Sequence, residues 1–546
     1  MKYYHVGVDV GSSSIRVAFT DSNGVIVAVD SENLDYTQSL ENPKFVTQSS
    51  EQILQGYDRC INRINDQLKD EEFKLVSIGV AATCSMVVME RTIDGLVPYP
   101  VDYGFKDSKQ NIVFWMDSRA EKETKDINDS LKGDKLLNYH GGAFIEEMGL
   151  PKIKWLIDNI PNQDLEDIVF FELYDFITFK LSKASNISTG TQDLKTSDTG
   201  YHIAMDGSIK GWDLDLLKRL DLDILSNGNF KAIGRLESSY TKTYLPIPDA
   251  GSLVYITEEN LAIGHGVIDC YAGWIASCGK KIQNTLTMIA GTSTCFLVAH
   301  NNPSPSPGIW GPYNTLISEL QVSEGGQSTT GKLIEHLFET HPAFKQIESD
   351  PFTLLEDRLT ILEAVTGESA HFKNKDNFLY GDLSGNRTPY ADGSMRGVFI
   401  GESTDISLND LTLKYLCILE FLAFQTKQVL ESLKGHDIGK VIISGSQAKN
   451  LRFVKLLAMV TGLPVEVSKT QPGYSGVKGA AYLGIAAFQR KSLLEIISNL
   501  NEDGVVYEPE VSDPKLVKLL EVKYRVMKDM AERQRDYRNW VSKALE

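Results

Sequence analysis

The sequence predicts an α/β protein built from two related lobes. Two short segments, residues 8–14 and 288–294, repeat one pattern 280 residues apart: an apolar run ends at one glycine, and three hydroxyl residues follow. Another apolar run comes after each segment, so each reads as a β-hairpin. At 546 residues the chain is too long for one core, since domains usually hold roughly 100–250 residues. We therefore expect two lobes of about equal size, residues 1–275 and 276–546.

Apolar patterning predicts the elements of the first lobe in chain order. Strands are expected at residues 3–10, 15–20 and 25–31, followed by a helix over 51–67 with apolar residues at helical spacing. Two more strands, at 75–81 and 111–116, end in the polar clusters 83–85 and 117–119. Because ligands bind at strand ends in α/β sheets, both clusters are candidates for a substrate pocket.

The same patterning predicts the elements of the second lobe in chain order. Residues 405–432 form a long helical pattern, 441–444 a short strand, and 478–488 a helix of small residues. Asp513 as N-cap and Pro514 in the first turn begin a terminal helix that runs to about residue 543. Its apolar residues, which include Tyr524, Met527 and Trp540, either pack on their own lobe or form an interface. A homodimer is therefore one of two open alternatives.

Composition excludes several classes of partner. A net charge of −18 argues against nucleic acid or an anionic membrane, because either requires a basic surface. No stretch approaches 18 consecutive apolar residues, and the N-terminus runs directly into a strand without a leader pattern. The six cysteines contain no C-x-x-C pair and are expected to be buried free thiols. These observations predict a cytoplasmic protein.

The two hairpin turns are suited to phosphate. Each exposes backbone N–H groups and hydroxyls, a concave row of donors typical of anion sites. The turns are Gly11, Ser12 and Ser13 in the first hairpin, and Gly291, Thr292 and Ser293 in the second. Two such turns in one chain indicate that both lobes grip one polyphosphate, which is a phosphotransfer hypothesis.

Two aspartates stand where phosphotransfer would need them. Asp9 lies two residues before Gly11, and a carboxylate there is compatible with ATP if Mg²⁺ lies between them. The alternative is a turn-capping aspartate. Asp269 ends an apolar run and fits a general base for an alcohol, although an ordinary helix N-cap would look the same. Asp117 and Arg119 could likewise be a surface ion pair.

Three glycine turns complete the candidates. In residues 325–328 and 385–389 a glycine turn is followed by polar residues, and each segment taken alone looks like an ordinary loop. Residues 445–450 follow a predicted strand and lead into a helix, a place where adenosine could lie against bare backbone.

In this order the motifs resemble those of the FGGY carbohydrate kinases over nearly the whole chain. The matching segments are 7–12 (GVDVGS), 115–120 (WMDSRA), 148–156 (MGLPKIKWL), 268–273 (IDCYAG), 290–295 (AGTSTC), 308–313 (GIWGPY), 324–328 (EGGQS), 385–389 (GNRTP) and 479–484 (GAAYLG). Residues 83–87 (TCSMV) and the GNRTP stretch resemble the D-ribulokinase-like branch most. The resemblance implies two actin/hexokinase-type (ribonuclease H-like) lobes with an active-site cleft between them.

The resemblance also implies a role for each matching position. Asp269 matches the catalytic base, and Asp9 matches the acidic residue near Mg²⁺. The residues implied to bind the sugar are Thr83, Ser85, Trp115, Asp117, Arg119 and Asp269. Those expected to bind ATP are Gly11, Ser12, Ser13, Gly291, Thr292, Ser293, Gly326, Gln327, Gly445, Ser446 and Asn450. The chain departs from the branch at Ala81, Ser118 and the pair Ile145 and Glu146, which bears on the choice of sugar. It also departs at Ser446, which adds bulk beside the nucleotide.

The predicted function is therefore ATP-dependent phosphorylation of a ketopentose or related polyol, with D-ribulose converted to D-ribulose 5-phosphate. A kinase for another sugar such as xylulose is the nearer alternative. A nucleotide-binding pseudokinase or assembly protein on the same fold is another, as is a chaperone-type or filament-forming ATPase. Retention of Asp9 and Asp269 and the sugar-side motifs favour the sugar kinase.

Overall fold

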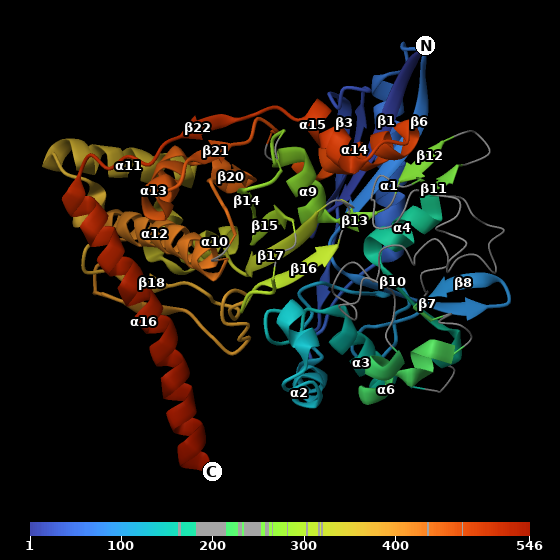
Figure 1. Ribbon diagram of the computed structural model, residues 1–546, viewed down its shortest axis with the longest axis horizontal. Coiled ribbons are helices and arrows are strands. Elements are labelled where there is room, and N and C mark those ends of the chain that lie inside the picture. The colour runs from blue at the N-terminus through green and yellow to red at the C-terminus, as the bar shows by residue number, and fades with distance from the viewer. Residues whose placement is uncertain are drawn as a thin grey trace.

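The structure of the protein is a computed structural model. It describes residues 1–161, 165–181, 214–227, 232–233, 253–256, 261–264, 266–280, 282–301, 304–314, 317, 320–433, 436–471 and 473–546. Within these ranges the chain forms two α/β lobes that lie side by side (Figure 1).

The first sheet belongs to the N-terminal lobe and has seven strands. They are β1 (Lys2–Val10), β2 (Ser14–Thr20), β3 (Ile26–Asn33), β6 (Phe73–Ala82), β11 (Leu253–Ile256), β12 (Ala262–Gly264) and β13 (Val267–Ile268). Their order is β11-β12-β6-β1-β2-β3, and β13 also pairs with β6. Strands β1, β2 and β3 are antiparallel neighbours, whereas β6 runs parallel to β1, β12 and β13.

The sheet of the C-terminal lobe repeats this topology. Its strands are β14 (Thr285–Ala290), β15 (Thr294–His300), β16 (Trp310–Asn314), β17 (Gln321–Gln327), β20 (Lys440–Ser444), β21 (Val465–Val467) and β22 (Val505–Tyr507). Strands β14, β15 and β17 are antiparallel neighbours, and β14, β20 and β21 are parallel. The two hairpins thus occupy equivalent places, β1–β2 and β14–β15, as the repeated sequence pattern predicts.

A smaller sheet lies below the first one and supports the predicted sugar cluster. Its strands are β4 (Thr37–Gln38), β5 (Val46–Gln48), β7 (Met86–Thr92), β8 (Gly95–Pro98), β9 (Ile112–Val113) and β10 (Ile168–Glu172). Helices α2 (Glu121–Ser130), α3 (Gly149–Asn159) and α6 (Leu214–Arg219) accompany it (Figure 1). The strand predicted at 111–116 is only two residues long, because the chain turns after Val113 toward Trp115.

Two helices lie between the first sheet and the C-terminal sheet. Helix α9 (Asp269–Ser277) packs against β14, and α14 (Ser475–Gln489) packs against β1, β6 and α9. The approach is close enough that a Cβ on Gly79 would lie 1.9 Å from the carbonyl oxygen of Ala480. The small residues of the predicted helix at 478–488 are thereby explained. Helix α14 comes late in the chain yet covers the first sheet. The boundary between the lobes at residues 275 and 276 stays a prediction.

The remaining helices include those predicted over residues 51–67 and 405–432 and after residues 445–450, together with others that the sequence pattern did not predict. The N-terminal lobe has α1 (Ser50–Gln67), capped by Ser49, and α4 (Leu173–Leu181). The C-terminal lobe has α10 (Gly331–Thr340), α11 (Pro351–Thr366), α12 (Leu408–Ser432) and α13 (Leu451–Thr461), with a two-stranded sheet of β18 (Phe378–Tyr380) and β19 (Val398–Ile400). Helix α15 (Leu493–Leu500) joins the core of the first sheet.

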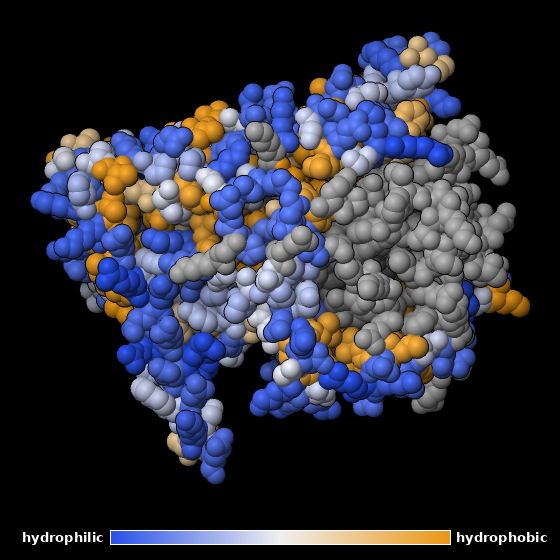
Figure 2. Space-filling model, viewed as in Figure 1, coloured by the Kyte–Doolittle hydropathy of each residue, from blue (hydrophilic) through white to orange (hydrophobic). Residues whose placement is uncertain are grey.

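The terminal helix α16 (Pro514–Leu545) begins as predicted, with the Asp513 side chain accepting from Lys515 N and Leu516 N. Tyr524 and Met527 are buried in the core of their own lobe, whereas Trp540 is 58% exposed. The distal half projects from the body of the molecule (Figures 1 and 2). Among the described residues, no helix is long and apolar enough to cross a membrane.

Candidate active site

The two predicted aspartates lie at the carboxyl ends of parallel strands in the first sheet. Asp9 is paired with Ala81 across β1 and β6, and Ile268 is paired with Ala82 across β13 and β6. Since these three strands are parallel, their carboxyl ends lie together. Asp9 and Asp269 are therefore two strand spacings apart in backbone position, roughly 10 Å. Their side chains are close enough for the Asp269 charge to act on Asp9.

Asp9 is held in a buried position. Burial raises its pKa to about 7, the negative charge of Asp269 adds to this rise, and Arg16 opposes it. The guanidinium NH1 of Arg16 lies 3.7 Å from Asp9 Oδ2. On the other side, a Cβ at Gly476 would lie 2.4 Å from the same oxygen. The first turn of α14 therefore approaches the carboxylate as closely as a glycine permits.

Asp269 is the first residue of α9, and the helix N-cap is Ile268. Its Oδ1 accepts a 2.7 Å hydrogen bond from Cys270 N. Burial raises the pKa of Asp269 to about 6, while backbone hydrogen bonds oppose the rise. Asp269 thus differs from the N-cap alternative. It is a desolvated carboxylate that is still mostly ionised near neutral pH, which suits a general base.

The first hairpin and the predicted sugar cluster are joined by hydrogen bonds. The indole Nε1 of Trp115 donates to Ser12 Oγ at 2.9 Å, and Trp115 N donates to Ser85 Oγ at 3.0 Å. Ser85 and Thr83 share a further hydroxyl contact of 2.9 Å. The structure therefore brings Ser12, Thr83, Ser85 and Trp115 together, as the sequence predicts for two sides of one site.

Asp117 and Arg119 lie close to this cluster but face inward. The Arg119 NH2–Asp117 Oδ2 distance is 2.8 Å, and neither side chain is exposed. Asp117 also accepts from Val46 N, and the guanidinium lies over the rings of Phe45 and Trp155. The surface ion pair considered as an alternative is wrong, because the pair is fully buried. Its geometry favours a role in fixing the loop that carries Trp115, and a direct contact with sugar stays a prediction.

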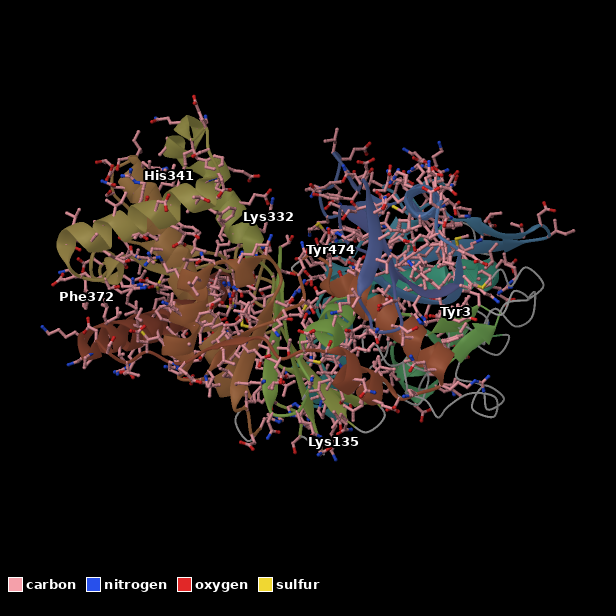
Figure 3. The ribbon with its side chains drawn as sticks, turned by 90° about the horizontal axis from the view of Figure 1, so that it is seen from above. Tyr3, Lys135, Lys332, His341, Phe372 and Tyr474 are labelled. Carbon is pink, nitrogen blue, oxygen red and sulfur yellow. The ribbon has the colours of Figure 1, made fainter. Side chains whose placement is uncertain are left out.

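The second hairpin is braced by the start of α10. Thr330 N and Lys332 N donate to the carbonyl oxygen of Thr292 at 2.9 and 3.2 Å, and Gly331 N donates to that of Gly291 at 3.0 Å. The Gly291 N–H bonds to Ser293 O at 2.9 Å, which closes the turn. The hydroxyl-bearing tips of both turns, Ser13 and Thr292, are exposed. In Figure 3, Lys332 at the start of α10 and Tyr474 at the start of α14 face the junction of the lobes.

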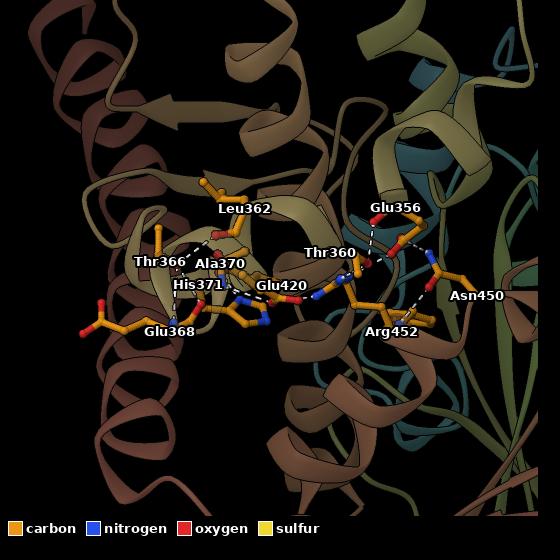
Figure 4. Close-up of polar contacts among 12 residues, drawn as sticks. Glu356, Thr360, Leu362, Thr366, Glu368, Ala370, His371, Glu420, Asn450 and Arg452 are labelled. Carbon is orange, nitrogen blue, oxygen red and sulfur yellow. Dashed lines mark hydrogen bonds and ion pairs between the residues drawn. The ribbon is translucent and has the colours of Figure 1, made fainter. Parts of the chain in front are cut away.

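Residues 445–450, which are predicted to contact adenosine, begin beside the second hairpin, but the side chain of Asn450 bonds to other residues. Gly445 has φ of +94°, and a Cβ there would lie 2.3 Å from Ala290 O. Ser446 Oγ lies 3.5 Å from the same oxygen. Asn450, however, caps α13 through Phe453 N and donates to Glu356 Oε1 at 2.8 Å (Figure 4). Its side chain is thus engaged in an internal polar network.

Gly326 and Gln327 end β17 next to an arginine that the site prediction did not include. Gly326 N donates to Thr388 Oγ1 at 3.0 Å, and a Cβ at Gly326 would lie 2.8 Å from Arg387 Cδ. The guanidinium of Arg387 pairs with Glu147 Oε2 at 2.6 Å and lies 5.5 Å from the centre of a Trp115 ring. Arg387 therefore links the C-terminal lobe to the sugar cluster of the N-terminal lobe.

Two further charged residues were missed. Lys152 Nζ donates to the carbonyl oxygens of Phe114 and Trp115 at 2.9 Å each, and burial lowers its pKa. Glu172, at the end of β10, is 3% exposed, and burial raises its pKa to about 8. A carboxylate ending the apolar run 168–172 was the same signal that identified Asp269. Lys152 gave no comparable signal, because a lysine in a helix is usually exposed.

Comparisons with known proteins agree with this geometry. Residues 4–225 match the N-terminal domain model, and residues 286–488 the C-terminal domain model, of the FGGY family of carbohydrate kinases. Protein MPA43 of Saccharomyces cerevisiae is 34% identical over 99% of this chain and 98% of its own length. The D-ribulokinase YDR109C of the same yeast is 34% identical over 89% of this chain and 72% of its own.

A solved structure shares the fold at low identity. Plasmodium falciparum glycerol kinase with ADP is 17% identical, covers 97% of this chain and 98% of its own, and has a TM-score of 0.74. The two-lobed fold predicted from the paired hairpins is thereby confirmed. The chain belongs to the FGGY family of carbohydrate kinases, and it is a sugar kinase.

Proposed function

We propose that this kinase transfers the γ-phosphate of ATP to the terminal hydroxyl of a ketopentose, D-ribulose in the first place, to give D-ribulose 5-phosphate. The observation that carries the proposal is the placement of Asp9 and Asp269 at one sheet edge, beside a hydroxyl-rich hairpin that is bonded to Trp115. The choice of D-ribulose is supported by the relative named D-ribulokinase and by a Staphylococcus aureus ribulokinase that is 24% identical over 96% of this chain.

Asp269 acts as the general base. With a pKa of about 6 it is mostly ionised at neutral pH, and its burial keeps it reactive toward a hydroxyl proton. The sugar oxygen forms a bond to the γ-phosphorus while the bond to the β–γ bridging oxygen breaks. ADP leaves, and the hydroxyl proton passes to Asp269.

Asp9 and the two hairpin turns hold the phosphates. The carboxylate of Asp9 fits Mg²⁺, since carboxylate oxygens are ligands that this hard cation accepts. When bound, Mg²⁺ would offset the charge of the phosphate oxygens. Gly11, Ser12 and Ser13, with Gly291, Thr292 and Ser293, supply neutral donors to the same oxygens. Gly326, Gln327, Gly445, Ser446 and Asn450 complete the proposed nucleotide side.

The sugar lies against Trp115, Thr83 and Ser85, with Asp117 and Arg119 beneath them. Ala81 and Ser118, where the ribulokinase-like pattern has Asp and His, alter this pocket. Xylulose or another ketose is therefore the competing substrate, because one lost hydroxyl contact can change discrimination by orders of magnitude. Six free thiols in the structure suit the reducing cytoplasm as the place of action.

The test is ADP release by the purified protein with MgATP and a panel of D-ribulose, L-ribulose, D-xylulose, pentoses and polyols. We expect D-ribulose to give the highest kcat/KM. Asp269→Asn should retain nucleotide binding and lose about 10²–10⁴-fold in turnover, whereas Asp58→Asn on the exposed face of α1 should behave like the wild type.

Other results would contradict the proposal in distinct ways. A higher kcat/KM for another sugar would replace D-ribulose and leave the mechanism intact. Near-normal turnover of Asp269→Asn would remove the proposed base. ATP binding without turnover on any sugar would favour a nucleotide-binding protein that has lost the kinase reaction.

A further inference from the structure

Three potential metal ligands converge next to the proposed base. The Sγ atoms of Cys270 and Cys295 and a carboxylate oxygen of Glu324 all lie within 4.8 Å of one another. They come from α9, β15 and β17, so the cluster exists only in the folded protein. Cys270 and Glu324 are 8% and 6% exposed, and Cys295 is half-buried.

The separations of these atoms are compatible with a tetrahedral thiolate site. With Zn–S bonds of about 2.3 Å, two sulfurs on one zinc ion are roughly 3.8 Å apart. Because all three donor atoms lie within 4.8 Å of one another, small side-chain movements would bring them to a common ion. Zinc sites with three protein ligands leave the fourth position to water or another small ligand.

The surroundings also suit a cation. Tyr271 OH donates to Glu324 Oε2 at 3.1 Å, which orients the carboxylate as partners of metal ligands commonly do. Two thiolates and a carboxylate carry three negative charges against two on the ion. The guanidinium of Arg387, which also pairs with Glu147, lies near enough for its charge to act on Glu324.

We propose that Cys270, Cys295 and Glu324 form a binding site for a thiophilic divalent cation such as Zn²⁺, separate from the Mg²⁺ position at Asp9. Thiolate sulfur selects zinc over magnesium, because Mg²⁺ takes oxygen ligands. The two sites also use different elements of the fold, because the cysteines belong to α9 and β15 and Asp9 belongs to β1.

An ion in this site would inhibit the kinase, a consequence that rests on the proposed function. Cys270 directly follows Asp269, so an ion held by Cys270 fixes the first turn of α9 and restrains the carboxylate that must reach the hydroxyl proton. It also ties α9 to β15 and β17, which restrains the junction of the lobes. Zinc would therefore lower turnover reversibly without displacing Mg²⁺.

Binding is tested first, without ATP or sugar, by titrating the reduced, metal-free protein with Co²⁺ as a spectroscopic probe and then with Zn²⁺. We expect one ion per chain, with thiolate-to-cobalt charge-transfer absorption that Zn²⁺ abolishes. Cys270→Ser and Cys295→Ser should each weaken binding by at least about tenfold. Cys417→Ser, which removes a buried thiol of α12 outside the cluster, is the matched control.

A second measurement on the unmodified protein guards against variants that fold poorly. Zn²⁺ should protect Cys270 and Cys295 from alkylation, as read by mass spectrometry of peptides, and should leave the labelling of the other four cysteines unchanged. Charge-transfer absorption that survives in both serine variants would overturn the site. Protection of other cysteines in place of this pair would overturn it as well.

The inhibitory consequence is tested separately. With a substrate that the enzyme turns over, Zn²⁺ should inhibit, a chelator should restore activity, and Cys295→Ser should be inhibited at least about tenfold less strongly. Metal binding without inhibition would refute the consequence and leave the site standing. Failure of the sugar assay in the absence of zinc would refute the proposed function alone, because the spectroscopic titration does not depend on turnover.

Discussion

Trp115 Nε1 and Ser12 Oγ are joined by a 2.9 Å hydrogen bond. The bond connects the turn of the first phosphate hairpin to the ring against which the sugar is proposed to lie. Ser12 also accepts from Gln48 through its carbonyl oxygen at 3.0 Å, so the turn is held from two directions. A shift of the phosphate turn is therefore expected to shift Trp115 in the proposed sugar pocket, and the reverse.

Trp115→Phe removes this hydrogen bond and keeps most of the ring. We expect KM to rise for both sugar and ATP by about 3- to 10-fold, since a net hydrogen bond is worth about 0.5–1.5 kcal/mol. Steady-state kinetics with each substrate varied in turn measure the effect. Trp540→Phe, at an exposed position of α16, is the control. A rise confined to the sugar would show that the turn does not depend on the indole.

Gly476→Ala tests the contact between α14 and Asp9. The added Cβ would lie 2.4 Å from Asp9 Oδ2, so either the carboxylate or the start of the helix must move. We expect at least about tenfold loss of kcat/KM for MgATP, as misplacement of a positioned group commonly costs that much or more. Gly439→Ala is the control, because a Cβ there would lie 3.9 Å from the carbonyl oxygen of Asn284, an ordinary van der Waals contact. Normal MgATP kinetics of Gly476→Ala would contradict a role for Asp9 at the phosphates.

The pH dependence of the reaction follows from Asp269. Burial raises its pKa to about 6, and the protonated acid cannot accept a proton. As pH falls below about 6, kcat/KM for the sugar should therefore drop by about tenfold per pH unit and level off above pH 7. Kinetics at saturating MgATP give the profile, with circular dichroism at each pH as the control for folding. A flat profile down to pH 5 would exclude this carboxylate as the base.

Lys523→Met tests how α16 is anchored. Lys523 Nζ is buried, pairs with Glu420 and donates to Asn374 O at 2.7 Å. Removing the ammonium leaves the buried Glu420 carboxylate with His371 and Asn374 as partners. We expect a loss of about 3–5 kcal/mol in the free energy of unfolding.

Chemical denaturation measures this loss, and Lys528→Met supplies the comparison. Lys528 pairs with Glu431 at 3.1 Å with about a third of each side chain exposed, so its removal should cost less than about 1 kcal/mol. Equal losses in the two variants would mean that the buried pair does not anchor the helix.

The sequence alone determined the features that depend on local pattern. The paired Gly-Ser/Thr turns predict two hairpins, and both occupy equivalent strands of two sheets with the same topology. Asp513 and Pro514 predict the start of α16 correctly. Such features are local because a turn or a cap is satisfied by its own neighbours in the chain.

Tertiary structure decided which polar side chains face the site. Asp117 and Arg119 look like pocket residues in sequence, yet they satisfy each other inside the fold. Asn450 serves an internal network, while Arg387 and Lys152 reach the sugar cluster from distant segments. The sequence determines the charge and the hydrogen-bonding capacity of each side chain. Its partners are chosen only when burial forces each polar group to find one, and those partners come from anywhere in the chain.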